Sequence, residues 1–373
     1  MAGNQTKTIS AASARAHTRK SNKGGRKAFK PSSNMIALIV ALVGCFLGYA
    51  YFSLRAPPPK ICGSPGGPLV TSPRIKLSDG RHLAYKEKGV SKEEAKYKIV
   101  VTHGFDDSKD FRLAISEELL KELQIYILSF DRAGYGESDP NPGRSVRSEA
   151  FDIQELVDGL QLGPKFYLLG MSIGAYPVYS CLKFIPHRLS GAALVVPFVN
   201  YWWRCFPAPL SKEGLGRMLV QDQWTFRIAH YAPSLVYWWM TQKWFPSMSI
   251  MEGKMDIFSR SDLEVIKLLS EDPMEGQEKV RQQGVYECLH RDMMVAFGKW
   301  DFDPTDITNP FPNKEGSIHI WQGYEDKMIP FTLNRYLSEK LPWIHYHEVP
   351  DAGHLMIYNS THCEAIIKAL VST

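Results

Sequence analysis

The stretch FYLLGMSIGAYPV, residues 166–178, decides which fold and which chemistry to expect of this chain. An apolar, strand-like run leads into Gly170-Met171-Ser172-Ile173-Gly174, and small, helix-compatible residues follow. A G-x-S-x-G match alone is weak evidence, because a chain of this length would contain one by accident roughly one time in ten. A nucleophilic serine on a sharp strand-to-helix turn, however, needs small flanking residues, and this context is present here. Ser172 is therefore the candidate nucleophile, and an ordinary packed serine is the alternative.

A serine hydroxyl needs a general base, and the base needs an acid that orients it. Two later strand ends supply candidates. The segment WQGYEDKMIP places Asp326 in a loop after an apolar strand, and VPDAGHLMIY places His354 after the next strand. The chain order serine, aspartate, histidine is the nucleophile–acid–base order expected of one particular fold. Glu325, the neighbour of Asp326, is the alternative acid.

An acyl-transfer site also needs two backbone N–H groups that stabilise the oxyanion. The N–H of Ile173 is one expected donor. The other should come from the loop after the apolar run IVVTHG, which makes Phe105 or its neighbour the candidate. His103 and Gly104 would let this loop turn beside the serine. We interpret His103 as a support of the loop, with a second base as the alternative.

Apolar runs of strand length alternate with helical stretches along most of the chain, for example around RLAISEELLKEL and RSEAFDIQELVDGL. This alternation predicts a mostly parallel sheet with helices on both faces. It breaks between about residues 198 and 315, and six of the nine tryptophans lie between Asn200 and Phe245. We interpret this segment as a helical cap insertion over the site. Its aromatic residues would mainly pack the cap helices, and contact with a bilayer is the alternative.

The basic charge of the chain is confined to its N-terminal part. Residues 1–78 contain twelve of the 44 Lys and Arg residues and none of the 39 Asp and Glu residues. The remainder is acidic, which argues against nucleic-acid binding. Residues 35–54 carry no charge and are long enough for a transmembrane helix, whereas the apolar part of a secretory signal is shorter.

The denser basic residues before this helix predict a cytosolic N-terminus and a single-pass protein of the endoplasmic reticulum or another endomembrane. A plastid membrane is the alternative, because the tail also has the composition of a transit peptide. Gly44 and Gly48 form a GxxxG pair that is a weak signal for a homodimer. The sequon at Asn359 would be glycosylated only in a lumenal domain.

Taken together, the motifs resemble the α/β-hydrolase superfamily, and in particular plant membrane-associated members with an epoxide-hydrolase-like pattern but a serine nucleophile. The resemblance covers about Ile75 to Ala369. The residues that carry it are His103-Gly104, Asp131–Asp139 (DRAGYGESD), Gly170–Gly174, Gly323–Asp326 and Gly353-His354. It implies an α/β-hydrolase fold. It also implies acyl chemistry, because the epoxide hydrolases and haloalkane dehalogenases of this fold attack with an aspartate. The His-x4-Asp signature of some acyltransferase-like relatives is missing after His354.

We therefore expect four parts: a basic disordered tail (1–34), a transmembrane helix (35–54), a Pro/Gly-rich linker (55–73) and an α/β-hydrolase domain (74–373) with its cap. The six cysteines form no CxxC pattern, so we expect buried free thiols and no metal site, and the chemistry requires no cofactor.

The predicted function is that of a membrane-anchored serine hydrolase. It would cleave a small-molecule or lipid ester of apolar character through a Ser172–His354–Asp326 triad and an acyl-enzyme. An acyltransferase, or a non-catalytic ligand-binding or scaffold protein on the same fold, is the alternative.

Overall fold

The computed structural model describes residues 32–271 and 277–372. The first 31 residues of the predicted basic tail lie outside the described residues. The chain divides into two units, one that ends at Phe52 and one that begins at Ser53. Each unit is described by itself below.

The described part of the first unit is one helix, α1 (Ser33–Leu54). It has 22 residues, is strongly apolar, and none of its residues is buried. Its length and composition suit a membrane span, although an N-terminal signal sequence can also form an apolar helix at this position in a chain.

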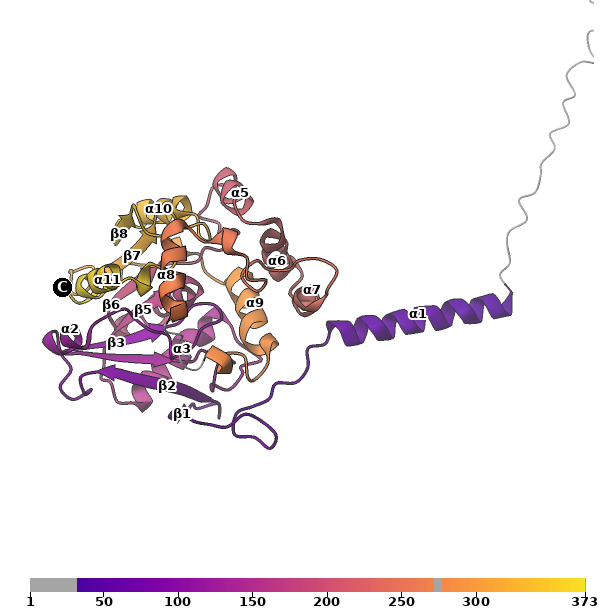
Figure 1. The fold of residues 1–373 in the computed structure, drawn as a ribbon, viewed down its shortest axis with the longest axis horizontal. Coiled ribbons are helices and arrows are strands. Elements are labelled where there is room, and N and C mark those ends of the chain that lie inside the picture. The colour runs from indigo at the N-terminus through magenta and orange to yellow at the C-terminus, as the bar shows by residue number, and fades with distance from the viewer. Residues whose placement is uncertain (1–31, 272–276, 373) are drawn as a thin grey trace, which may run out of the picture. The chain divides into compact units, whose positions relative to one another are not determined.

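A sheet of eight strands forms the centre of the second unit (Figure 1). The strands are β1 (Arg74–Lys76), β2 (His82–Gly89), β3 (Tyr97–Thr102), β4 (Ile125–Phe130), β5 (Phe166–Met171), β6 (Leu189–Val195), β7 (Ile318–Gly323) and β8 (Ile344–Val349). Their spatial order is β1-β2-β4-β3-β5-β6-β7-β8. The strands β3 to β8 are parallel, and β2 pairs antiparallel with both β1 and β4. The sheet is therefore mostly parallel, as predicted.

Helices cover both faces of this sheet, because successive strand residues point to opposite sides. Val100 and Leu168 belong to a core with α3 (Val146–Gly159), α4 (Ala175–Phe184) and α10 (Phe331–Lys340). Their neighbours Val101 and Leu169 belong to a second core with α2 (Glu117–Glu122) and α11 (Ser360–Val371). The helix α2 is shorter than its apolar spacing predicts, because Ser116 caps it by accepting a hydrogen bond from the N–H of Leu119.

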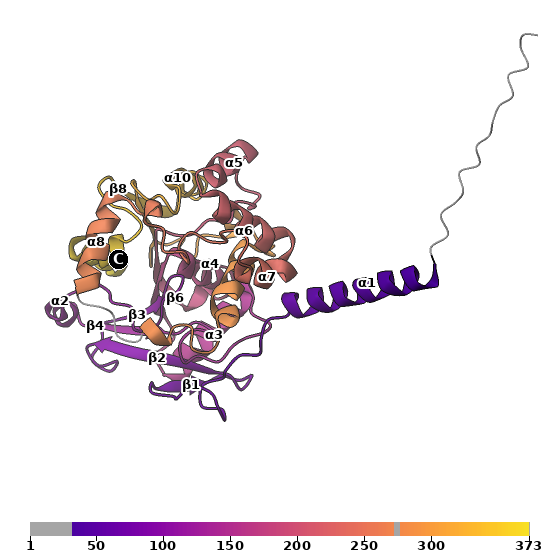
Figure 2. The ribbon, with the colours of Figure 1, turned by 45° about the vertical axis from the view of Figure 1, so that its right-hand side comes forward.

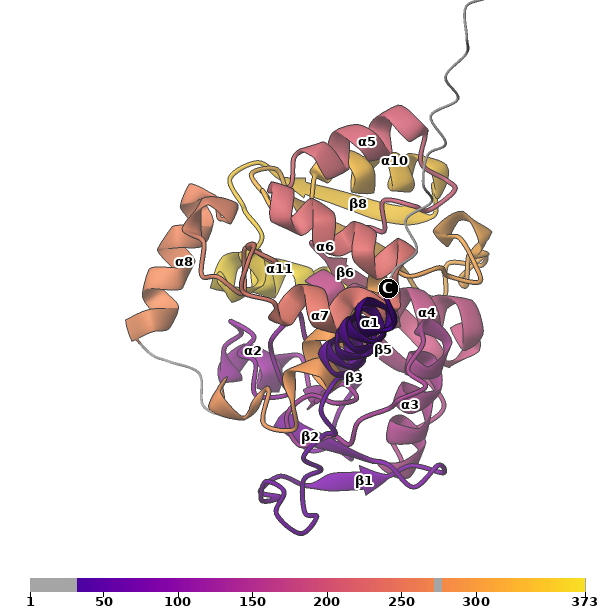
Figure 3. The ribbon, with the colours of Figure 1, turned by 90° about the vertical axis from the view of Figure 1, so that its right-hand side faces the viewer.

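The segment between β6 and β7 is mainly helical. Its helices are α5 (Ala208–Gly216), α6 (Val220–Tyr231), α7 (Val236–Thr241), α8 (Arg260–Glu271) and α9 (Arg291–Phe297), and the π-helix Tyr286–His290 directly precedes α9. The helices α5, α6 and α7 follow one another over one side of the domain, and α8 stands apart from α6 and α7 in all three views (Figures 1, 2 and 3). We call residues 198–315 the cap.

The segment expected to be a linker, residues 55–73, is bound to the domain from Lys60 onward. The N–H of Lys60 donates to the carbonyl of Gln283 at 2.9 Å, and Cys62 is buried. Further along, the hydroxyl and N–H of Thr71 both donate to the carboxylate of Glu137. Positive φ angles at Gly63 (81°) and elsewhere turn the chain back on itself. The expected linker is therefore too long, because its glycines fold it onto the surface.

The six cysteines, all within the described part of the chain, are free thiols. Cys62, Cys181, Cys288 and Cys363 are buried, Cys205 is half-buried and Cys45 is exposed on α1.

Candidate active site

Ser172 lies at the point where β5 turns into α4, in a short 3-10 turn of residues 172–174. Its φ is +53°, in the left-handed region that residues with a side chain rarely adopt. Backbone strain of this kind clusters at functional sites, where the surrounding structure holds it in place. Ser172 is 9% exposed, so a small molecule has limited access to it.

The two glycines of the motif are required by the space around them. A Cβ at Gly170 would lie 2.5 Å from the carbonyl oxygen of Gly174 and 2.5 Å from Cγ2 of Val178. A Cβ at Gly174 would lie 2.4 Å from the carbonyl oxygen of His103 and 2.6 Å from that of Thr102. These distances are far shorter than real Cβ contacts, so the tight strand-to-helix turn explains the G-x-S-x-G pattern.

The structure brings Ser172, His354 and Asp326 together in one hydrogen-bonded line. Nε2 of His354 lies 2.9 Å from Oγ of Ser172, and its Nδ1 lies 2.9 Å from Oδ2 of Asp326. Asp326 follows β7 and His354 follows β8, so adjacent parallel strands deliver them to the same edge of the sheet. The alternative acid Glu325 instead accepts a hydrogen bond from Ser261 at 3.3 Å.

The carboxylate of Asp326 is itself held in place. Its Oδ1 accepts hydrogen bonds from the N–H groups of Met328 and Ile329 at 2.8 and 2.9 Å, which leaves Oδ2 to face His354. With Nδ1 of His354 donating to Oδ2, Nε2 is free to accept the hydroxyl proton of Ser172. This is the tautomer that a general base requires.

Opposing effects set the pKa of His354. Burial disfavours the charged imidazolium, but the charge and hydrogen bond of Asp326, together with the charge of Asp262, outweigh it. The pKa of His354 is therefore raised above its usual value of 6.5.

Asp262 is a site residue that the sequence analysis missed. It lies in the first turn of α8 in the cap, and its Oδ1 accepts a hydrogen bond from the N–H of Leu355 at 2.7 Å. Its Oδ2 accepts from the N–H of Ser259 at 3.0 Å, and its own N–H donates to the Ser259 hydroxyl. The pattern Ser259-x-x-Asp262 is a capping-box signal that could have indicated this helix start. The cap thus holds the loop of His354.

The loop after β3 lies beside the serine. A Cβ at Gly104 would lie 3.7 Å from Cβ of Ser172. Phe105 directly follows Gly104 in this loop, and Ile173 directly follows Ser172 in the 3-10 turn, so the two expected oxyanion donors belong to the two segments that meet beside the serine.

His103 supports this loop through both of its ring nitrogens. The N–H of Arg132 donates to Nε2 at 3.1 Å, so Nδ1 carries the proton and donates to the carbonyl of Gly104 at 2.9 Å. Burial, and then the charge of Arg132, lower the pKa of His103 well below 6.5. The ring is neutral and fully engaged, which argues against the alternative of a second base.

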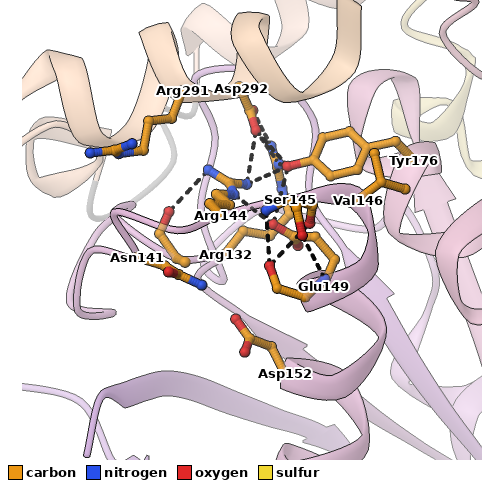
Figure 4. Close-up of polar contacts among 12 residues, drawn as sticks. Arg132, Asn141, Arg144, Ser145, Val146, Glu149, Asp152, Tyr176, Arg291 and Asp292 are labelled. Atoms are coloured by element: carbon orange, nitrogen blue, oxygen red, sulfur yellow. Dashed lines mark hydrogen bonds and ion pairs between the residues drawn. The ribbon is translucent and has the colours of Figure 1, made fainter. Parts of the chain in front are cut away.

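Arg132 links the same loop to the cap, and Figure 4 shows it beside Asp292. Its Nε donates to the carbonyl of His103 at 3.1 Å, and its Nη2 donates to the carbonyl of Gly104 at 3.0 Å. Its two terminal nitrogens also bind both oxygens of Asp292 at 2.6 Å each. Asp292 belongs to α9, so one fully buried ion pair joins the cap to the loop beside Ser172.

Further buried groups complete this network (Figure 4). Arg144 lies 2.8 Å from Asp292 and donates to Glu149 at 2.5 Å, while Tyr176 of α4 bonds to Arg132, Arg144 and Asp292. Two guanidinium groups thus face two carboxylates. Burial alone would raise the pKa of Asp292, but Arg132 and Arg144 lower it to about 2, so Asp292 stays charged.

A cavity of about 370 Å³ lies between the cap and the loop after β7. Asp326 is part of its wall, and Ser172 and His354 are not. Its apolar walls include Met218, Phe226, Met248, Ile257 and Phe331. Within the described residues no group of three or more His, Cys, Asp or Glu side chains is placed to hold a metal ion.

The comparisons with known proteins agree with this architecture. The model of a family described as "Alpha/beta hydrolase family" matches residues 99–369. A thermophilic esterase from Thermogutta terrifontis is 20% identical with a TM-score of 0.52, covering 81% of this chain and 99% of its own. An esterase from Exiguobacterium antarcticum is 18% identical with a TM-score of 0.55, covering 81% and 98%.

An enol-lactonase from Burkholderia xenovorans LB400 is 15% identical with a TM-score of 0.54, covering 80% of this chain and 98% of its own. At such identities the likeness concerns the fold alone. No match was found among curated proteins. The predicted fold class, a mostly parallel sheet with helices on both faces and one apolar N-terminal helix, is confirmed.

Proposed function

Because this chain belongs to the alpha/beta hydrolase family, we propose that it is a serine hydrolase that cleaves carboxylic esters. The observation that carries the proposal is the hydrogen-bonded line from Ser172 through His354 to Asp326, with 2.9 Å at each step. The esterases and the lactonase among its structural neighbours support an ester as the substrate class.

In the first half of the reaction, Oγ of Ser172 attacks the ester carbonyl while Nε2 of His354 takes the hydroxyl proton. Asp326 orients the ring and stabilises the imidazolium that forms. The negative charge on the carbonyl oxygen is held by the N–H groups of Ile173 and Phe105. The carbon–oxygen bond to the alcohol then breaks, and His354 returns its proton to the departing alcohol.

In the second half, water attacks the acyl group on Ser172 and gives a proton to Nε2 of His354. The bond between Oγ and the acyl carbon breaks, Oγ regains the proton, and a carboxylic acid leaves. The protonated ring of His354 is stabilised by the same charges, of Asp326 and Asp262, that raise its resting pKa. Each half of the reaction thus returns the site to its starting protonation state.

An apolar or lipid-like ester is the substrate that we expect. The cap above the site is rich in aromatic residues, and the cavity beside Asp326 has mainly apolar walls. The exposed apolar helix α1 would hold the enzyme in a membrane, where such esters concentrate. We propose a cytosolic N-terminus, a lumenal hydrolase domain and an endomembrane location, with a plastid membrane as the alternative. The pair Gly44 and Gly48 on α1 would support a homodimer.

The test is a panel of esters graded by acyl length, given to the purified full chain in detergent. We expect free carboxylic acid from apolar esters, and its loss in Ser172→Ala at unchanged thermal stability. Ser338→Ala, which changes a serine of α10 far along the chain from the motif, is the matched control. Acyl transfer to an added alcohol instead of to water would favour an acyltransferase. A folded protein that cleaves none of the esters would contradict the proposal.

A further inference from the structure

Five large apolar side chains stand exposed on neighbouring elements of the cap. They are Val220, Trp224 and Tyr231 on α6, and Trp244 and Phe245 just after α7. We call these five residues the α6–α7 patch. Trp244 is 66% exposed and Trp224 is 51% exposed, which is unusual for side chains that normally bury most of their area. The two helices pack together, since Nε1 of Trp239 on α7 donates to Oγ1 of Thr225 on α6 at 2.6 Å.

The patch is held in a fixed shape. Val220, Trp224 and Tyr231 are four and seven residues apart, a spacing that puts them on one face of α6. After α7, Oε1 of Gln242 accepts hydrogen bonds from the N–H groups of both Trp244 and Phe245, at 2.7 and 3.0 Å. These hydrogen bonds hold the turn in a conformation that exposes two aromatic rings to solvent. Exposure of apolar rings to water is unfavourable in a monomer without a binding partner.

The charge around the patch is positive. Between Glu213 and Glu252 the only acidic residue is Asp222, which is buried and bonded to Ser249. The same stretch contains Arg227 and Lys243, and also Arg217, which pairs with Glu213 at 2.7 Å. Aromatic rings flanked by basic side chains are the combination that membrane interfaces favour, because the rings sit at headgroup depth and the cations meet lipid phosphates.

The chain from α1 joins the domain close to α7. Lys60 is bonded to Gln283, three residues before Tyr286, and the ring of Tyr286 contacts that of Tyr237 on α7 with centroids 5.9 Å apart. Only residues 55–59 connect α1 to Lys60. A chain of this length spans at most about 20 Å when fully extended. If α1 crosses a bilayer, Lys60 is tethered within that distance of the end of α1.

We infer that the α6–α7 patch rests on the surface of the lipid bilayer in which α1 is anchored. The inference depends on α1 as a membrane span and not on the chemistry of Ser172, so the two can fail separately. The tether brings this part of the cap to the membrane, and the exposed tryptophans and basic residues dock it there. The cap of the hydrolase domain would then face the lipid from which an apolar ester is drawn.

Tryptophan fluorescence tests this inference directly, because α1 contains no tryptophan and all nine lie between residues 202 and 343. The full chain is reconstituted in vesicles of phosphatidylcholine and phosphatidylserine, with or without bromine on the upper acyl chains. Bromine quenches only tryptophans that reach the lipid. We expect a partial loss of emission, of the order of the share that two of nine tryptophans carry, and its disappearance in Trp224→Phe/Trp244→Phe.

Two further variants test whether the loss of quenching reflects loss of contact between the patch and the lipid, and not merely removal of the tryptophans that report it. Val220→Asp/Phe245→Asp keeps both exposed tryptophans but should lose the quenching, while it still floats with the vesicles through α1. Phe151→Asp, which changes an exposed aromatic residue on α3, should leave the quenching as in the wild type. A wild-type chain that floats with vesicles but shows equal emission with and without bromine would overturn the inference. So would a chain that does not float, or a patch that instead joins two copies.

Discussion

Nη2 of Arg132 lies 3.0 Å from the carbonyl oxygen of Gly104, in the same peptide unit as the N–H of Phe105. Because a trans peptide is planar, its carbonyl and its N–H point in opposite directions. Nδ1 of His103 holds the same oxygen at 2.9 Å, so the orientation of the whole unit is fixed. Arg132 is therefore a positioning residue for the expected oxyanion donor, and Asp292 of the cap positions Arg132 in turn.

The first prediction concerns this positioning. In Arg132→Lys the single ammonium group cannot hold two carbonyls and a carboxylate at once. We expect kcat to fall by about 10- to 100-fold with little change in KM, because an oxyanion donor acts mainly in the transition state. Steady-state kinetics on the best ester of the panel measures both constants.

Arg144→Lys is the matched control for this prediction. Arg144 contacts the same Asp292 but neither carbonyl of the loop, so this variant should lose comparable stability and keep its kcat. If kcat falls equally in both variants, in proportion to their loss of stability, then Arg132 stabilises the fold and does not position the oxyanion donor.

The second prediction concerns the turn at Ser172. Gly174→Ala places a Cβ 2.4 Å from the carbonyl of His103, and the backbone must move to relieve it. We expect a loss of about 1–3 kcal/mol in the free energy of unfolding, or a failure to fold, together with loss of activity. Gly216→Ala, at the end of α5 where a Cβ meets nothing within 4 Å, should change neither property. Denaturant unfolding measures the free energy of unfolding of both variants, and the ester assay measures their activity. A Gly174→Ala variant that is active and as stable as the wild type would show that the turn is not tight.

The third prediction concerns pH. The raised pKa of His354 keeps the ring protonated at higher pH, and only the neutral ring can act as a base. The acid limb of kcat/KM should therefore lie above pH 6.5. Asp262→Asn removes a negative charge that favours the imidazolium, so the limb should move to lower pH. A pH profile that is the same in Asp262→Asn would contradict this electrostatic role.

The same shift has a consequence for stability. A raised folded-state pKa means that the protonated ring stabilises the fold fully below about pH 6.5, the unfolded value, and that this stability is lost as the pH rises through the folded pKa. Asp262→Asn should therefore lose more stability at acidic pH than at alkaline pH. Thermal unfolding at a series of pH values provides the comparison.

The fourth prediction concerns topology. Asn359 is exposed and caps α11, where its Oδ1 accepts a hydrogen bond from the N–H of His362 and leaves Nδ2 for a glycan. For a lumenal domain we expect an endoglycosidase-sensitive shift in mobility that Asn359→Gln removes. The domain should also resist protease added to sealed microsomes. Digestion of the domain in sealed microsomes would place it in the cytosol.

The sequence places Ser172, Asp326 and His354 each after an apolar strand, and parallel strands end at one edge of a sheet, so the three could be proposed together as a candidate site. The ion pair of Arg132 and Asp292 could not be predicted from the sequence. The two residues are 160 positions apart and meet only when the cap folds against the rest of the domain. Asp262 was missed for the same reason. The contacts of Lys60 and Thr71 with the domain cannot be predicted from the sequence, because a Pro- and Gly-rich composition fits flexible and tightly turned chains equally.

The central claim is that Ser172 is an activated nucleophile, and reaction with a fluorophosphonate tests it most directly. The probe is added to the full chain in detergent, and mass spectrometry of the digested protein locates the adduct. We predict one adduct, on Ser172, whose rate of formation falls in His354→Ala and which is absent in Ser172→Ala. A folded wild-type protein that stays unlabelled, or that carries the adduct on another residue, would contradict the claim.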